Sequence, residues 1–217
     1  MDRRTTPRID VDGVGSLRGK TGDRRQETGD GRRYPVSFAY PLLSETKMKI
    51  ETEIPLIDEI LGDSDHGYRN HVYRMVNFCF AQGEFDAEEK EKIVIAGCFH
   101  DLGIWSADTW DYLPPSIDLA NRYLERTSRE DWQDEISTMI DLHHRIRRCE
   151  DGSLVEIFRR GDLVDFSLGL FKCGIRRDFI RAVKLEFPNA GFHRQLATHA
   201  CRWTVRHPLN PVPVLKW

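Results

Sequence analysis

The sequence predicts an all-α protein. From residue 48 onward, apolar residues recur at spacings of three and four, and no segment shows the sustained alternation of a half-buried strand. The chain has 217 residues, of which 40% are hydrophobic and 31% are charged, enough for one sizeable core but not for two. We therefore expect one bundle of about seven helices over residues 48–217.

The first helices are predicted by two different patterns. One is an amphipathic stripe that ends near Gln82 and Gly83 and is made up of Val72, Met75, Val76, Cys79 and Phe80. The next helix has a good N-cap residue in Asp86, and its run IVIAGCF at 93–99 is apolar on every side. That run predicts a helix at the centre of the bundle, closed by Gly103.

A loop with Pro114 and Pro115 separates this central helix from the rest. Five further helices are expected around 117–124, around 132–140 and at about 153–170, 176–187 and 190–206. The Pro-rich tail from His207 onward is not helical, because proline lacks the backbone donor that a helix needs.

The first 47 residues differ from the rest in composition. They hold ten Lys and Arg against seven Asp and Glu without apolar periodicity, which predicts a disordered basic leader. This leader is either a dispensable tail or the product of a translation start set too early, and a nucleic-acid-binding arm is the alternative. The remainder holds 22 basic against 28 acidic residues, which argues against nucleic acid as the main partner.

Composition also excludes several locations and site types. No stretch approaches eighteen consecutive apolar residues, so we expect no membrane span. The cysteines stand singly, which favours the reducing cytoplasm over a disulfide framework or a thiolate zinc site; they are Cys79, Cys98, Cys149, Cys173 and Cys201.

Several ionisable residues occupy helix faces that should be apolar. They are His71, His100, Asp101, His143, His144, Asp162 and Asp165. A single buried histidine is more often a hydrogen-bonded core residue, but here four helices each bring such a residue inward. A metal offsets the cost of burying all of them, and the N and O donors suit one divalent ion of Mn, Fe, Co, Ni, Zn or Mg.

The order of these residues resembles a known family. His71 in NHVYRM, His100 and Asp101 in AGCFHDLG and Asp162 in RRGDLVD resemble the HD-domain superfamily of metal-dependent phosphohydrolases, over about residues 56–187. The resemblance implies an HD-domain-like helical bundle in which these four residues bind the metal. Asp165 is the alternative to Asp162 as the last metal ligand. If it does not bind the metal, we expect it to hydrogen-bond to a residue that does, and so to orient that residue.

Family members often carry further histidines that hold a second metal or act on the substrate. His143 and His144 match the later of these positions, whereas the segment after Asp101 contains no histidine, so we expect a single metal. Adjacent helical residues differ in direction by about a hundred degrees, so only one of the two should face the metal. We slightly prefer His144 as the residue that protonates the leaving group, with His143 as the alternative.

The resemblance implies a metal-dependent hydrolase of a small phosphorylated substrate, such as a nucleotide, with water activated by the metal and by Asp101. Arg74 and Lys172 are candidates for phosphate contacts, although ion pairing or solvation is the commoner role of such residues. Trp105, Trp110 and Tyr112 either line a pocket or only pack.

Other functions remain open. The same metal-bound water could hydrate a small nitrile-like substrate, or the fold could be a non-catalytic ligand-sensing module. An iron-dependent oxygenase is a third alternative, but it would need the ligands of a second metal, one of which this sequence lacks. The sequence does not decide whether the chain forms a homo-oligomer.

Overall fold

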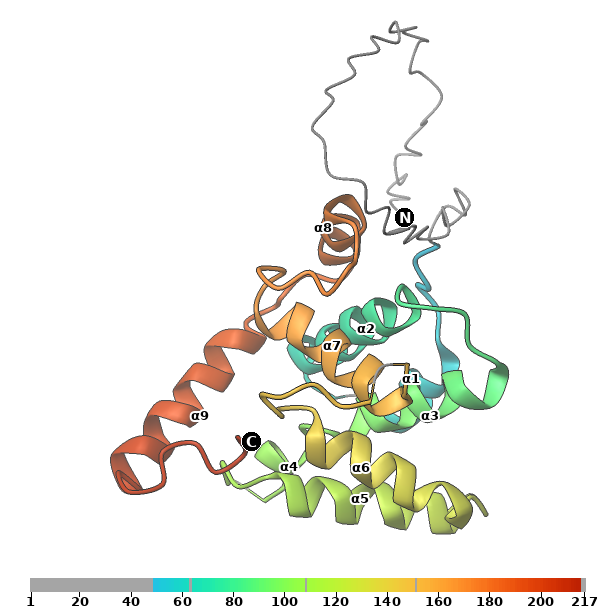
Figure 1. Cartoon of the computed structure of the whole chain (residues 1–217). Coiled ribbons are helices and arrows are strands. Elements are labelled where there is room, and N and C mark those ends of the chain that lie inside the picture. Colours follow the sequence, from blue (N-terminus) through green and yellow to red (C-terminus); the bar gives the residue numbers. More distant parts are fainter. Residues whose placement is uncertain (1–48, 63, 108, 151, 216–217) are drawn as a thin grey trace, which may run out of the picture. The chain divides into compact units, whose positions relative to one another are not determined.

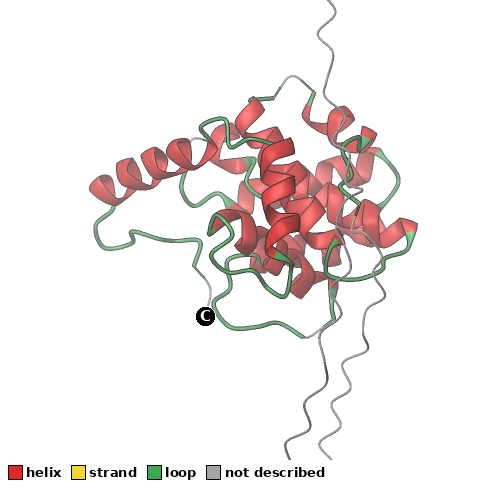
Figure 2. Ribbon diagram, turned by 90° about the horizontal axis from the view of Figure 1, so that it is seen from above, coloured by secondary structure: helices red, strands yellow, loops and turns green. Residues whose placement is uncertain are grey.

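The computed structural model describes residues 49–215 except 63, 108 and 151, so the predicted leader over residues 1–47 lies outside the described residues. Within this part every regular element is a helix, as Figures 1 and 2 show, which confirms the all-α prediction. The elements are α1 (Pro55–Leu61), α2 (His66–Phe80), α3 (Ala87–Phe99), α4 (Gly103–Ser106), α5 (Leu113–Arg126), the 3-10 turn Glu130–Trp132, α6 (Gln133–Leu142), α7 (Leu154–Phe166), α8 (Arg177–Glu186) and α9 (Phe192–Arg206).

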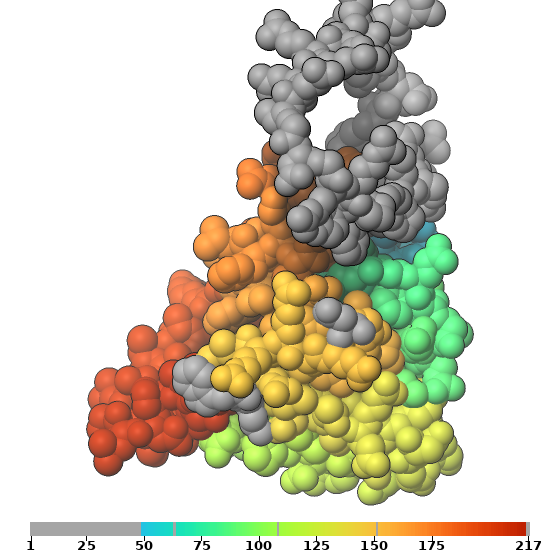
Figure 3. All heavy atoms as spheres, viewed as in Figure 1, coloured from blue at the N-terminus to red at the C-terminus, as the bar shows by residue number. Residues whose placement is uncertain are grey.

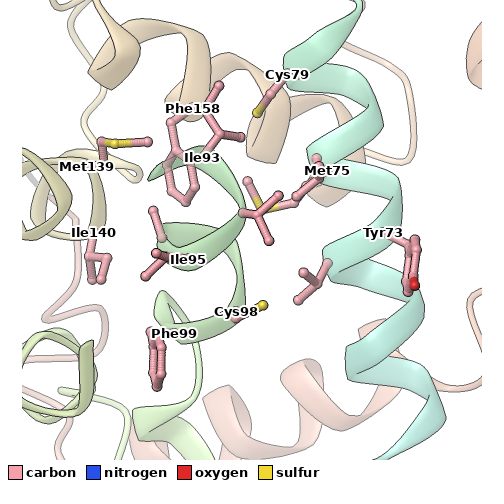
Figure 4. Close-up of a cluster of buried hydrophobic side chains, with 14 of the residues drawn as sticks. Tyr73, Met75, Cys79, Ile93, Ile95, Cys98, Phe99, Met139, Ile140 and Phe158 are labelled. Carbon is pink, nitrogen blue, oxygen red and sulfur yellow. The ribbon is translucent and has the colours of Figure 1, made fainter. Parts of the chain in front are cut away.

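The helix α3 lies at the centre of the core. Its residues 93–99 are all buried, as the apolar run predicts, and its first turn carries a capping box between Asp86 and Glu89. Figure 4 shows the α3 side chains between those of α2 on one side and α6 on the other. This central position matters for the site, because the chain leaves α3 directly into His100 and Asp101.

Two segments near α3 differ from the prediction. The helix ends at Phe99, and Gly103 begins the short helix α4 instead of closing α3. Pro114 and Pro115 lie inside the first turn of α5, not in a loop before it. Proline fits there because backbone N–H groups in the first turn have no helical partner.

The three C-terminal helices occur where periodicity places them, with shorter ends. The helix α7 stops at Phe166 because Leu168 and Gly169 adopt positive φ values of 56° and 84°, which reverse the chain. The helix α9 leads away from the other helices, and Figures 1 and 3 show it projecting from the body. Its buried residues are Phe192 and Leu196, both near its start.

No helix in the described part of the chain is both long enough and apolar enough to cross a membrane.

Candidate metal centre

Five ionisable side chains from four parts of the fold meet in the core. Their relative exposures are at most 4%, and they are His71 from α2, His100 and Asp101 from the residues after α3, His143 from the end of α6 and Asp162 from α7. Burying so many charged or polar groups costs several kcal/mol unless each has a partner. The contacts of each atom therefore show what the cluster is suited to bind.

Close packing of α2 against α7 brings His71 and Asp162 together. The contact is made at Gly161, where a Cβ atom would overlap Sγ of Cys79 and lie 3.0 Å from the backbone oxygen of Met75. Only glycine allows the two helix backbones to approach this closely. From the other side, the ring of Phe192 stacks on His71 with 4.2 Å between ring centroids.

The donor atoms lie at distances typical of ligands that share one ion. Nε2 of His71 is 3.0 Å from Nε2 of His100, and both nitrogens are 3.7 Å from Oδ1 of Asp162. Bonds of about 2.1 Å to a common ion would separate its ligands by about 3.0 Å at right angles and about 3.4 Å in a tetrahedron. The observed spacing is close to these values.

Asp101 completes the ring of donors. Its Oδ2 lies 3.4 Å from Nε2 of His100 and 3.8 Å from Nε2 of His71, and its Oδ1 lies 3.6 Å from Nε2 of His143. Subsets of the cluster, such as His71 with His100 and Asp162, have ligand atoms that all lie within 4.8 Å of one another.

The second ring nitrogen of each histidine fixes its tautomer. Nδ1 of His100 is 2.8 Å from the backbone oxygen of Gly97, and Nδ1 of His143 is 2.7 Å from that of Ile140. A carbonyl oxygen only accepts, so both Nδ1 atoms carry hydrogen and donate. This leaves Nε2 of each ring as the atom that faces the cluster, and it is the atom that a metal would bind.

His71 is held in the same tautomer by a carboxylate. Its Nδ1 donates to Oδ2 of Asp165 at 2.7 Å. Burial lowers the pKa of His71 to about 4, so its ring is neutral at pH 7 and Nε2 is an acceptor. A carboxylate behind a histidine in this way is the usual support of a metal ligand.

Two buried atoms of the cluster have no hydrogen-bond partner among the described residues. They are Oδ1 of Asp101 and Nε2 of His143, which face each other. The 3.6 Å between them is too long for a hydrogen bond, and leaving such buried atoms unpaired costs about 1–3 kcal/mol each. A divalent cation satisfies both atoms together with the lone pairs of His71 and His100, so the donor set fits a metal.

The two central carboxyl groups have opposite pKa shifts. Burial raises the pKa of Asp162 to about 7, with a further upward contribution from the neighbouring negative charge of Asp101. Burial also acts upward on Asp101, but His100 and His143 outweigh it and hold its pKa well below the ordinary value. Asp101 is therefore the carboxylate that stays ionised most readily.

Arg74 is engaged by other groups of the chain, and its assignment as a phosphate contact stays a prediction. Its Nε donates to Oδ1 of Asp165 at 2.6 Å, its second terminal nitrogen donates to Oδ2 at 2.8 Å, and the first bonds the carbonyls of Phe187 and Pro188. His71 and Arg74 together outweigh the effect of burial and lower the pKa of Asp165. Arg74 thus holds the carboxylate that orients His71.

The other candidate for a phosphate contact, Lys172, lies in an exposed segment after α7. Its ammonium group makes no hydrogen bond or ion pair with the cluster in the part of the chain that the structure describes.

Both histidines after α6 reach the cluster, whereas the sequence argument expected only one to do so. A nitrogen of His144 lies within 4.8 Å of ligand atoms of His143 and Asp162. His143 is the C-cap residue of α6 and keeps helical angles, with φ −63° and ψ −25°, and His144 follows it outside the helix. Nε2 of His144 also lies 2.7 Å from the phenol oxygen of Tyr112.

Comparison of the chain with family models, with curated proteins and with solved structures finds no match. The resemblance to the HD-domain superfamily therefore depends on the motif residues alone, and the site has to be interpreted from its own geometry.

Proposed function

We propose that this protein is a metal-dependent hydrolase of the HD-domain type. In this proposal His71, His100, Asp101 and Asp162 hold one divalent ion, and His143 faces the same ion. The observation that carries the proposal is the meeting of histidine lone pairs and carboxylate oxygens in a buried space, with Oδ1 of Asp101 and Nε2 of His143 unpartnered. A hydrogen-bonded core would have paired these atoms with donors.

A divalent ion bound there lowers the pKa of a coordinated water and neutralises charge on substrate oxygens. The side chains of the chain supply the remaining functions. Asp101 has a second carboxylate oxygen for a proton of the attacking water, because Oδ1 and Oδ2 face different histidines. In this proposal His144, which has a nitrogen within 4.8 Å of ligand atoms of His143 and Asp162, gives a hydrogen bond to the leaving group.

A small phosphorylated compound is the substrate class that the resemblance favours. The buried cluster fits a small reacting group, since each of the five residues is at most 4% exposed. Phosphate oxygens would be bound by the ion and by His144, because Asp165 and two carbonyls take four of the five N–H donors of Arg74.

Hydration of a small, neutral nitrile-like substrate is the second candidate. It is favoured by that same engagement of Arg74, because Asp165 and two carbonyls take four of the five N–H donors of this buried guanidinium. A neutral substrate needs no such cation and still uses the activated water.

A substrate panel tests the proposal. Protein loaded with Mn²⁺, Fe²⁺, Co²⁺, Ni²⁺ or Zn²⁺ is assayed with phosphomonoesters, nucleotides, cyanamide and small nitriles, and Asp101→Ala serves as the inactive control. We expect phosphoester hydrolysis by the native chain and its loss in the variant. Turnover of nitriles alone would establish the second candidate. Metal binding without turnover of any compound would contradict the enzyme and leave a ligand-sensing module.

A further inference from the structure

Tyr112 lies at the edge of the cluster on a firmly anchored turn. Its backbone oxygen accepts from the N–H of Ser116 at 3.0 Å, and the hydroxyl of Ser116 accepts from the N–H of Gly103 at 2.9 Å. A Cβ atom at Gly103 would overlap the backbone oxygen of Tyr112, so only glycine fits there. The start of α5 is thereby fixed against α4, two residues after Asp101.

The side chain of Tyr112 is buried, and its phenol contacts His144. The phenol oxygen is 2.7 Å from Nε2 of His144, and the two rings meet edge to face. Nε2 of His144 is the partner at this short distance, and the carboxylate of Asp101 also acts on the phenol through its charge and a hydrogen bond. A buried hydroxyl proton needs an acceptor, so the geometry favours donation from Tyr112 to Nε2.

The carboxylate of Asp101 is the other acceptor near the phenol. After burial, its negative charge is the largest cause that raises the pKa of Tyr112, so the phenol stays protonated and remains a donor. If Tyr112 donated to Asp101 instead, Nε2 of His144 would have to carry the hydrogen and donate to the phenol. The two arrangements differ in the tautomer of His144, which can be measured.

We propose that Tyr112 is a positioning residue that holds His144 with its hydrogen on Nδ1. With Nε2 occupied by the phenol, His144 is a hydrogen-bond donor to the substrate and not a ligand of the ion. Tyr112 thus separates the roles of two adjacent histidines, because His143 keeps its Nε2 lone pair for the ion. The kinetic part of this inference rests on the proposed hydrolase, whereas the tautomer does not.

The tautomer is tested by NMR on protein labelled with ¹⁵N-histidine and saturated with Zn²⁺, with the His144 signals assigned through His144→Gln. We expect hydrogen on Nδ1 of His144 in the native chain, and a mixture or hydrogen on Nε2 in Tyr112→Phe. Tyr73→Phe is the matched control, because Tyr73 is also buried but donates to Asp58. Hydrogen on Nε2 in the native chain would overturn the proposal.

Kinetics test whether the contact serves the reaction. We expect Tyr112→Phe to lower kcat by about 10–100-fold, the usual effect of losing such a supporting contact, with KM and metal content unchanged. His144→Gln should lower kcat similarly, and the double variant should lose no more, because Tyr112 acts through His144.

Losses that multiply in the double variant would show that Tyr112 acts independently of His144, and an unchanged kcat in Tyr112→Phe would show that the contact only packs. Either result overturns the kinetic part. If the native chain turns over no substrate, the proposed hydrolase fails, but the NMR experiment still decides the tautomer of His144.

Discussion

At the scale of single residues, the cluster depends on which ring nitrogen of each histidine faces the other donors. Nδ1 of His71, His100 and His143 each donates to an acceptor behind the ring, so Nε2 is left to face the cluster. Two of these supports are backbone carbonyls, which the sequence does not predict; the third is Asp165, which the sequence analysis expected to orient a ligand but did not pair with His71, 94 residues away.

Periodicity identified the ionisable residues on interior faces, and only the family resemblance separated Asp162, as the expected ligand, from Asp165. The two stand three residues apart on one face of α7, so periodicity treats them alike. In the structure Asp162 lies between His71 and His100, whereas Asp165 lies behind His71 and binds Arg74.

Removing Arg74 should destabilise the fold. Arg74→Met leaves Asp165 buried without its bidentate partner, which for buried ion pairs costs about 3–5 kcal/mol. We expect a decrease of this size in the free energy of unfolding, measured with urea at pH 7. A variant as stable as the native chain, but with a raised KM for phosphoesters, would place Arg74 at the substrate after all.

The contribution of Asp165 should depend on pH in a defined direction. Its pKa is lower in the folded chain than the ordinary value of 3.8, so its stabilisation is complete above about pH 4 and lost as the pH falls through the folded pKa. The difference in unfolding free energy between the native chain and Asp165→Asn should therefore be large at pH 7 and shrink below about pH 4. A constant difference across this range would contradict the ionised state of Asp165.

At the scale of helices, the site exists because α2, α3, α6 and α7 bring their polar residues to one place. Hydrophobic periodicity predicted these helices because each is long and has a continuous apolar face. It did not predict α1 and α4, since helices of 7 and 4 residues are too short to show a period. It also missed the contact of Tyr112 with His144, because side chains beyond helix ends follow no periodic rule.

The close approach of α2 and α7 should be sensitive to one methyl group. Alanine favours a helix over glycine by about 1 kcal/mol, but Gly161→Ala places its Cβ against the backbone of α2, and such overpacking costs about 1–3 kcal/mol. We expect a net loss of stability and weaker metal binding, measured by thermal unfolding and metal titration.

Gly83→Ala is the control for that substitution, because the nearest atom to its Cβ is a ring carbon of Phe85 at an ordinary 3.4 Å. Its stability should change by less than about 0.5 kcal/mol. If Gly161→Ala behaved like Gly83→Ala, the spacing of α2 and α7 would not control the site.

At the scale of the whole molecule, the ionisable cluster lies among largely apolar buried helix faces of the described residues, separate from the buried pair Glu156 and Arg159. The cluster residues come from positions between 71 and 162, so the site forms only when the bundle is assembled. We expect the metal to contribute to the stability of the fold for this reason, since an ion that binds the folded chain alone shifts the unfolding equilibrium toward it.

The content of metal in the purified protein tests the central claim most directly. The chain is purified without chelator or added metal and subjected to elemental analysis beside Asp101→Ala and His199→Ala; the latter removes a half-buried histidine of α9 outside the cluster. We predict about one equivalent of a divalent metal in the native chain and in His199→Ala, and none in Asp101→Ala. A native chain that binds no metal, even after reconstitution with Mn²⁺, Fe²⁺, Co²⁺, Ni²⁺ or Zn²⁺, would contradict the account.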